Sequence, residues 1–288
     1  MVLLIVVAVG LAAFFGGRGL SAGSQASKRL AGPRKAIRPD RPPPTLARRP
    51  PTTTTLVPTT LFAPTDPSAA LRTSCRSVVH IGDSTSESLV SPDYLPSASQ
   101  RLQAQYARVG VTNPIMEIEG ATSVVETING EPNAYDVARG LVNQGYKGCW
   151  VIALGLNDAA DVYVGSNVSL ATRIQRMMSV IGNEPVLWVN ATTLLTSGPY
   201  SETDMQSWNQ ALLQACPQYP NMRVFDWASL AQPSWFISDG IHYNSTGSAA
   251  RAAAIANALA EAFPASGPST SAGGHNDRPS GAPSCVVQ

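Results

Sequence analysis

Ser84 lies in the segment GDSTSES, from Gly82 to Ser88, directly after the apolar run SVVHI. If Gly82 and Asp83 turn the chain at the end of a strand, Ser84 opens the next segment, where unpaired backbone N–H groups favour developing negative charge. A serine hydroxyl becomes an effective nucleophile only when a neighbouring base accepts its proton. Because Gly-Asp-Ser is also a common turn sequence, the segment on its own favours a structural role.

Three histidines are candidates for that base. His275 lies in a Gly/Ser/Pro-rich tail, and His80 lies inside a predicted strand, where a buried structural histidine is expected. His242 stands in WFISDGIHYN, three positions after Asp239. A short turn there can bring the carboxylate to Nδ1 and orient the imidazole. The alternative is a loop whose aspartate only caps the turn, which is the weaker interpretation for a loop placed just before the last helix.

Acyl transfer also needs hydrogen-bond donors directed at the developing oxyanion. The segment GLND offers the side-chain amide of Asn157, and EGATS contains Gly120, which permits a close approach of the backbone. Taken alone, each is more often a turn residue or the end of a strand. Trp235 and Phe236, just before Asp239, either line a substrate pocket or pack against the sheet, and the sequence favours neither interpretation.

Five apolar segments predict the strands that would position these residues. They alternate with amphipathic segments of helical periodicity, the pattern of a parallel sheet covered by helices. Functional residues of such sheets gather at the carboxyl ends of the strands, where the candidate residues above are found. The predicted strands are 77–81, 114–119, 149–155, 185–191 and 222–227, and the predicted helices are 97–110, 134–146, 169–182, 201–217 and 245–263.

The order of these motifs resembles the four sequence blocks of the SGNH, or GDSL-like, esterase and lipase superfamily. The blocks are GDS at 82–84, the glycine at 120, GLND at 155–158 and DGIH at 239–242. The resemblance extends over residues 75–264. It implies an α/β fold, a flavodoxin-like three-layer α/β/α sandwich around the five predicted parallel strands, without a metal or other cofactor.

Carried over residue by residue, the resemblance makes Ser84 the nucleophile, His242 the base and Asp239 the residue that orients the base. The backbone N–H groups of Ser84 and Gly120, together with the Asn157 amide, would form the oxyanion hole.

The activity implied is that of a serine esterase, which cleaves acyl esters through an acyl-Ser84 intermediate. We expect its substrate to carry small O-acyl groups on carbohydrate polymers of the cell envelope. The alternatives are an O-acyltransferase on the same fold, a lipase acting on longer-chain esters, and a catalytically silent envelope-binding domain. Thr85 stands where many members carry leucine, which bears on the subfamily and substrate more than on activity.

The segments outside residues 73–264 have compositions unlike a folded core. Residues 1–23 begin with the uncharged run MVLLIVVAVGLAAFFGG and predict a signal peptide or membrane anchor. Residues 24–72 predict a basic, Pro/Thr-rich disordered linker, and residues 265–288 a disordered tail. We therefore expect an extracytoplasmic domain, secreted or anchored to the membrane. The basic residues that follow the apolar run favour the opposite orientation by the positive-inside rule.

The net charge of +1 for the whole chain conceals an acidic domain. Residues 73–264 contain 9 Lys and Arg against 16 Asp and Glu. A nucleic-acid partner is therefore not expected.

The four cysteines have no CxxC spacing, which argues against a zinc or dithiol-redox site. In an exported protein, disulfides are expected. Cys75 and Cys149 stand at the entrances of two predicted strands and are the preferred pair if those strands are neighbours. Cys216 and Cys285 remain as a second candidate pair.

Overall fold

The computed structural model describes residues 71–128, 130–265 and 285–288. The predicted signal peptide or anchor, nearly all of the predicted linker and most of the predicted tail lie outside these residues. Within these ranges, none of the helices combines the length and the apolar character needed to cross a bilayer.

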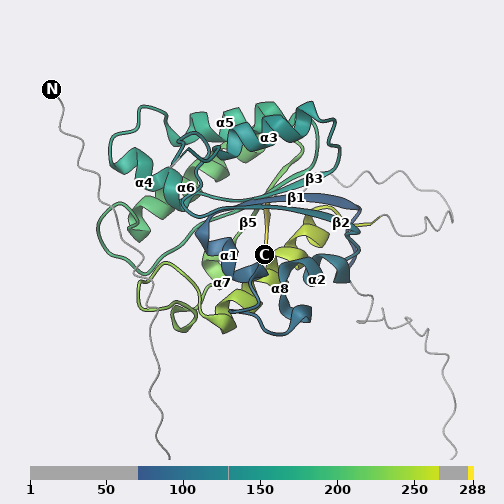
Figure 1. Ribbon diagram of the computed structural model, residues 1–288. Helices are drawn as coiled ribbons and strands as arrows, with labels where there is room; N and C mark the ends of the chain where they lie inside the picture. The colour runs from purple at the N-terminus through teal and green to yellow at the C-terminus, as the bar shows by residue number, and fades with distance from the viewer. Residues whose placement is uncertain (1–70, 129, 266–284) are drawn as a thin grey trace, which may run out of the picture. The chain divides into compact units, whose positions relative to one another are not determined.

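The described residues form a sheet of six parallel strands in the order β2-β1-β3-β4-β5-β6 (Figure 1). Each of the five predicted strands is present, and the prediction of a parallel α/β sheet is confirmed. The strands are β1 (Ser77–Gly82), β2 (Asn113–Ile118), β3 (Cys149–Ala153), β4 (Val186–Val189), β5 (Met222–Phe225) and β6 (Val286–Val287).

Helices cover both faces of the sheet, which gives the three layers expected (Figure 1). One face carries α3 (Ala134–Asn143), α4 (Leu156–Tyr163), α5 (Leu170–Ile181) and α6 (Glu202–Ala215). The other carries α1 (Ser84–Val90), α2 (Leu102–Arg108), α7 (Trp227–Leu230) and α8 (Ser245–Ala262). Short 3-10 turns lie at η1 (Ala98–Gln100), η2 (Cys216–Gln218) and η3 (Pro233–Trp235).

Alternation along the strands divides the apolar side chains between two cores. Val79 and Ile81 of β1 face the core under α3 to α6, whereas Val78 faces the core under α2 and α8. Trp150 and Val151 divide in the same way on β3. Because both faces are buried, the strands read as nearly continuous apolar runs, which explains why they are recognisable in the sequence.

The sixth strand was not predicted, and it corrects one boundary. Val286 and Val287 pair in parallel with Val224 and Phe225 of β5, although residues 265–288 were expected to form a disordered tail. Two apolar residues after a long polar segment give too short a signal for a strand. The disulfide between Cys216 and Cys285 explains how so short a strand is held against β5.

The preferred cysteine pairing is confirmed, because a disulfide joins Cys75 to Cys149. Strands β1 and β3 are neighbours, with Val78 opposite Cys149, which is the condition that the pairing required. The second candidate pair, Cys216 with Cys285, is also formed.

Two helices that were not among the predicted ones begin within the motifs GDS and GLND. Helix α1 starts at Ser84, and α4 starts at Leu156 after Gly155, which has φ of 137°. A Cβ atom on Gly155 would lie 2.1 Å from Nε1 of the buried Trp208, so only glycine fits this turn. Both motifs therefore place a helix N-terminus directly after a strand.

Candidate active site

Ser84, Asp239 and His242 form one hydrogen-bonded chain. Ser84 Oγ lies 2.8 Å from His242 Nε2, and His242 Nδ1 lies 2.7 Å from Asp239 Oδ2. With the proton on Nδ1 donated to the aspartate, Nε2 is free to accept the serine proton. The side chains of His242 and Asp239 are 36% and 40% exposed, so the chain opens to solvent.

Backbone groups of the DGIH loop hold the Asp239 carboxylate in place, in addition to the His242 side chain. Asp239 Oδ1 accepts hydrogen bonds from the backbone N–H groups of Ile241, at 2.8 Å, and His242, at 2.9 Å. Burial raises the pKa of Asp239, but the hydrogen bonds from His242 and these N–H groups outweigh it and lower the pKa below its usual value. The carboxylate is therefore held ionised and aimed at the imidazole.

The register of the sheet brings the other motifs to the same edge. Gly82, at the end of β1, lies opposite Ile118 of β2 and Ala153 of β3. Gly120 follows two positions after Ile118, and Asn157 four positions after Ala153. The candidate oxyanion donors thus come from strands on either side of the nucleophile.

Of the other two histidines, His80 is confirmed as a buried structural residue. Its Nδ1 lies 2.8 Å from the Tyr106 hydroxyl, and burial lowers its pKa to about 3. It therefore stays neutral at physiological pH. His275 lies outside the described residues.

The turn that presents Ser84 is held by a buried polar chain. Asp83 caps α1 by accepting from the Thr85 backbone N–H at 2.9 Å and from its hydroxyl at 2.7 Å. The same hydroxyl accepts from the guanidinium of Arg251 on α8, also at 2.7 Å. Arg251 in addition donates to the Thr85 carbonyl, at 2.9 Å. Thr85, Asp83 and Arg251 are all buried, so each depends on the others for its hydrogen bonds.

This chain explains the threonine at position 85. A leucine there could not accept from Arg251 or donate to Asp83, and both groups would lose a partner in the interior. Thr85 is therefore a local structural requirement of this domain, in a role that its sequence context did not indicate.

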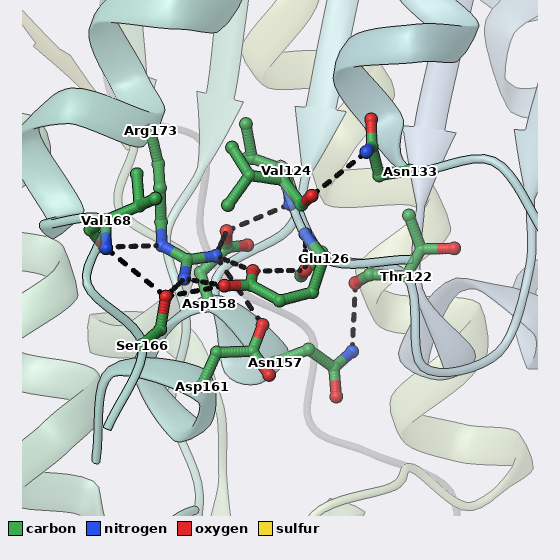
Figure 2. A network of polar contacts seen from close by, with 12 residues as sticks. Thr122, Val124, Glu126, Asn133, Asn157, Asp158, Asp161, Ser166, Val168 and Arg173 are labelled. Atoms are coloured by element: carbon green, nitrogen blue, oxygen red, sulfur yellow. Dashed lines mark hydrogen bonds and ion pairs between the residues drawn. The ribbon is translucent and has the colours of Figure 1, made fainter. Parts of the chain in front are cut away.

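The Asn157 side chain is oriented from both ends, and Figure 2 shows its contact with Thr122. Its Nδ2 donates to the Thr122 carbonyl at 3.0 Å, and its Oδ1 accepts from the Tyr200 hydroxyl at 3.2 Å. Because Nδ2 carries two hydrogens, one remains for a substrate oxygen. The Ser84 N–H lies in the first turn of α1 and has no acceptor within that helix.

Glu87 is a residue of the site that the sequence analysis missed. It is exposed on α1, one turn after Ser84, and a Cβ atom on Gly120 would lie 3.0 Å from its Oε1. Burial and the neighbouring Glu119 raise the pKa of Glu87, while the charge of His242 and a hydrogen bond from the Gly120 backbone oppose the rise. The carboxylate thus faces a candidate oxyanion donor. The signal available in the sequence was its position three residues after Ser84, because residues at this spacing lie on the same face of a helix.

Trp235 and Phe236 pack into the core below the DGIH loop. The Trp235 ring stacks on Trp227 with centroids 5.7 Å apart, and the buried Phe236 ring lies 4.8 Å from that of Tyr243. For Phe236 these contacts favour the packing interpretation over a pocket-lining one.

The loop after β2 is joined to α4 and α5 by a group of three carboxylates around one arginine (Figure 2). The Arg173 side chain is fully buried and pairs with Glu126, with Asp158 at 3.0 Å and with Asp161 at 3.5 Å. Asp158 also accepts from the Val124 backbone N–H at 2.9 Å. Asp158, the last residue of the GLND motif, therefore joins the loop after β2 to α5.

The three carboxyl groups differ in acidity because their partners differ. Burial would raise the pKa of Glu126, but hydrogen bonds from Arg173 and Ser166 lower it to about 2. Burial raises the pKa of Asp158 to about 6, against the opposing effects of the Val124 N–H and Arg173. Burial together with Glu126 raises the pKa of Asp161 to about 7. Asp161 is therefore the group of this cluster that titrates near neutral pH. No group of three or more His, Cys, Asp or Glu side chains in the described part of the chain is arranged to hold a metal ion.

Comparison with known proteins identifies the fold. No protein-family model matches the sequence, and no curated protein sequence matches it. The structure is similar to that of a lipase/acylhydrolase from Enterococcus faecalis, with a TM-score of 0.51 and 18% identity over 65% of this chain and 97% of that one. It is also similar to a carbohydrate acetylesterase family member from Sinorhizobium meliloti, with a TM-score of 0.50 and 13% identity over 63% of this chain and 95% of that one. The chain has the SGNH hydrolase fold, as the motifs predicted.

Replacing Thr85 with valine is expected to destabilise the domain by about 1–3 kcal/mol, because Asp83 and Arg251 each lose a buried hydrogen bond while the side-chain shape is kept. Urea unfolding followed by circular dichroism measures the change. T112V is the matched control, since the Thr112 hydroxyl makes one exposed hydrogen bond. Equal stability of T85V and wild type would contradict the role assigned to the buried chain.

Replacing Asp161 with asparagine is expected to raise the free energy of unfolding relative to wild type, and to raise it by about 1–3 kcal/mol more at pH 8 than at pH 4. The folded-state pKa of about 7 lies above the ordinary value of 3.8, so wild type loses stability as pH rises between these values. Asparagine keeps a hydrogen-bond donor toward Glu126 and does not titrate. Unfolding free energies of D161N and of the exposed control D136N at both pH values test this, and a D161N effect independent of pH would contradict it.

Proposed function

We propose that the domain is a serine esterase that hydrolyses small O-acyl esters through an acyl-Ser84 intermediate. The observation that carries the proposal is the hydrogen-bonded chain from Ser84 through His242 to Asp239, at the carboxyl edge of a parallel sheet. This arrangement supplies the nucleophile, a base and a carboxylate that orients the base, which are the three parts that serine acyl transfer requires.

In the first half of the reaction, Ser84 Oγ attacks the ester carbonyl carbon while His242 Nε2 takes the serine proton. The imidazolium that forms is stabilised by the Asp239 carboxylate, at 2.7 Å from Nδ1. The C–O bond to the alcohol then breaks, and the alcohol leaves with the proton from Nε2.

In the second half, water attacks the acyl-Ser84 carbonyl and gives its proton to His242. The bond to Ser84 Oγ breaks, the serine regains the proton and the carboxylic acid leaves. Both tetrahedral intermediates carry an oxyanion, for which the backbone N–H groups of Ser84 and Gly120 and the Asn157 amide are the proposed donors.

The surroundings of the site favour small, uncharged acyl groups on a polar carrier. Glu87 and Glu119 are exposed beside Gly120. Glu119 also lines a hollow of about 190 Å³, together with Thr122, Glu131 and several apolar residues of β1, β2 and α3. Carboxylates repel anionic esters and do not solvate long alkyl chains. A carbohydrate that presents hydroxyl groups fits this chemistry better than a lipid.

The two disulfides support an extracytoplasmic location, because disulfides persist mainly in oxidising compartments. We therefore propose acylated glycans of the cell envelope as the substrate class. Hydrolysis is preferred over transfer to a second hydroxyl, since 36% of the His242 side chain is exposed and water can reach the acyl-serine. Partition of the acyl group between water and an added oligosaccharide distinguishes the two reactions.

Replacing Ser84 with alanine is expected to lower the hydrolysis of p-nitrophenyl acetate by about 10⁴-fold or more, because the nucleophile is lost. The exposed Ser99 provides the control S99A, which should keep wild-type activity. Release of acetate from isolated acetylated envelope polymer, measured by chromatography, tests the substrate class. Undiminished activity in folded S84A would contradict the proposed mechanism.

Replacing Glu87 with glutamine is expected to raise kcat/KM for p-nitrophenyl acetate about fivefold at pH 8. Glu87 contacts the Gly120 oxyanion donor directly and acts on His242 only at longer range, so its repulsion of the oxyanion should exceed its attraction for the imidazolium. A charge–charge energy of about 1 kcal/mol at a solvent-exposed site corresponds to this factor. Steady-state kinetics measure it, with the exposed D93N as a control. A tenfold loss in E87Q would instead give Glu87 a direct part in the reaction.

A further inference from the structure

The loop between β2 and α3 must hold Gly120 in place although its backbone is strained. Ala121, the next residue, has φ of 60°, and among the described residues no other non-glycine has positive φ. An alanine in the left-handed region is unfavourable and persists only where neighbouring contacts impose it. The conformation at Gly120 therefore depends on what holds the rest of the loop.

Three successive links attach this loop to the neighbouring helices. Thr122 accepts from the Asn157 amide, and the Val124 N–H donates to Asp158 at 2.9 Å. Glu126 pairs with Arg173 through both carboxylate oxygens. Two of the links end on the GLND motif, so the loop that carries one candidate oxyanion donor is built against the residue that supplies another.

Arg173 is the group that two of these links share, those of Asp158 and Glu126. Its Nη1 donates to both Asp158 and Glu126 and its Nη2 to Glu126, while its Nε donates to the Val168 carbonyl at 3.1 Å (Figure 2). The planar fork of arginine fixes the angle between the two carboxylates as well as the distance. Its side chain is fully buried, so water does not replace these bonds.

We propose that Arg173 is a positioning residue for the reaction proposed above: it locks the loop that carries Gly120 to the helix that carries Asn157, so that both donors point at one oxyanion. The inference rests on the proposed function. Arg173 itself does not touch the nucleophile or the base; it acts through Glu126 and Asp158. A positioning role predicts a loss in kcat, because the oxyanion exists only during the reaction.

The variants R173M and R173K, with R139M as matched control, test this. Arg139 is 57% exposed and pairs with Asp136 at 2.8 Å, so its loss removes an ion pair far less buried. We expect R173M to lower kcat about 10- to 100-fold, with KM within about twofold of wild type. R173K should recover part of the loss, since lysine keeps the charge but not the fork. R139M should match wild type.

Inhibition by a boronic acid provides a second readout, because boronates form a tetrahedral adduct on an active serine. In R173M the inhibition constant should rise in step with the fall in kcat, a change that lower stability alone would not cause. All rates are expressed per folded protein, determined by near-ultraviolet circular dichroism.

The outcomes separate this inference from the proposed function. If wild type and S84A hydrolyse p-nitrophenyl acetate equally, the proposed function fails. If S84A is inactive while folded R173M keeps kcat within twofold, or loses only KM, the role of Arg173 is overturned. If R173M does not fold, E126Q decides: a several-fold lower kcat at unchanged KM supports the inference, and an unchanged kcat overturns it.

Discussion

The contact between α1 and α8 is the constraint on which the site depends, because it brings Ser84, the first residue of α1, to His242, which lies three residues before the start of α8. A hydrogen bond of 2.8 Å tolerates little movement of either helix. Below it, Ser88 and Ser248 are hydrogen-bonded in the interior, and Arg251 donates to Thr85. The polar groups between the two helices therefore fix the distance at which nucleophile and base meet.

The site is supported by two buried arginines, one on each side of the sheet. Arg251 lies under the nucleophile turn, and Arg173 lies under the oxyanion loop. Removing one partner from a buried ion pair, such as that of Arg173 with Asp158, costs about 3–5 kcal/mol, whereas an exposed pair contributes about 0–1 kcal/mol. Removing Arg251 would instead cost the buried Thr85 hydroxyl and carbonyl a hydrogen-bond donor. Exposed charges such as Arg139 can therefore vary freely, while the two buried guanidinium groups cannot. Because these two side chains are buried, removing them costs stability, and their positions are fixed by the surrounding contacts.

The strands and the order of the motifs could be predicted because each leaves a local signal. Buried parallel strands give continuous apolar runs, and a turn at a strand end needs Gly82 or Gly155. The roles of Thr85, Arg173 and Arg251 could not be predicted, since each depends on partners distant in sequence, up to 166 residues for Arg251 and Thr85. Glu87 was missed because α1, the helix that places it beside Gly120, was not among the predicted helices. Strand β6 was missed because pairing with β5, reinforced by a disulfide, compensates for its length of two residues.

The disulfides complement this arrangement from the opposite edge of the sheet. Cys75 precedes β1, Cys149 opens β3 and Cys285 precedes β6, so these cysteines stand at the amino ends of strands. The bridges span 74 and 69 positions in sequence, and closing loops of this size stabilises a domain by about 2–4 kcal/mol each. That stabilisation acts away from the carboxyl ends, where the loops carrying Gly120 and His242 lie. Covalent cross-links thus hold the amino edge, and hydrogen bonds and ion pairs set the geometry of the catalytic edge, which leaves that geometry sensitive to single buried side chains.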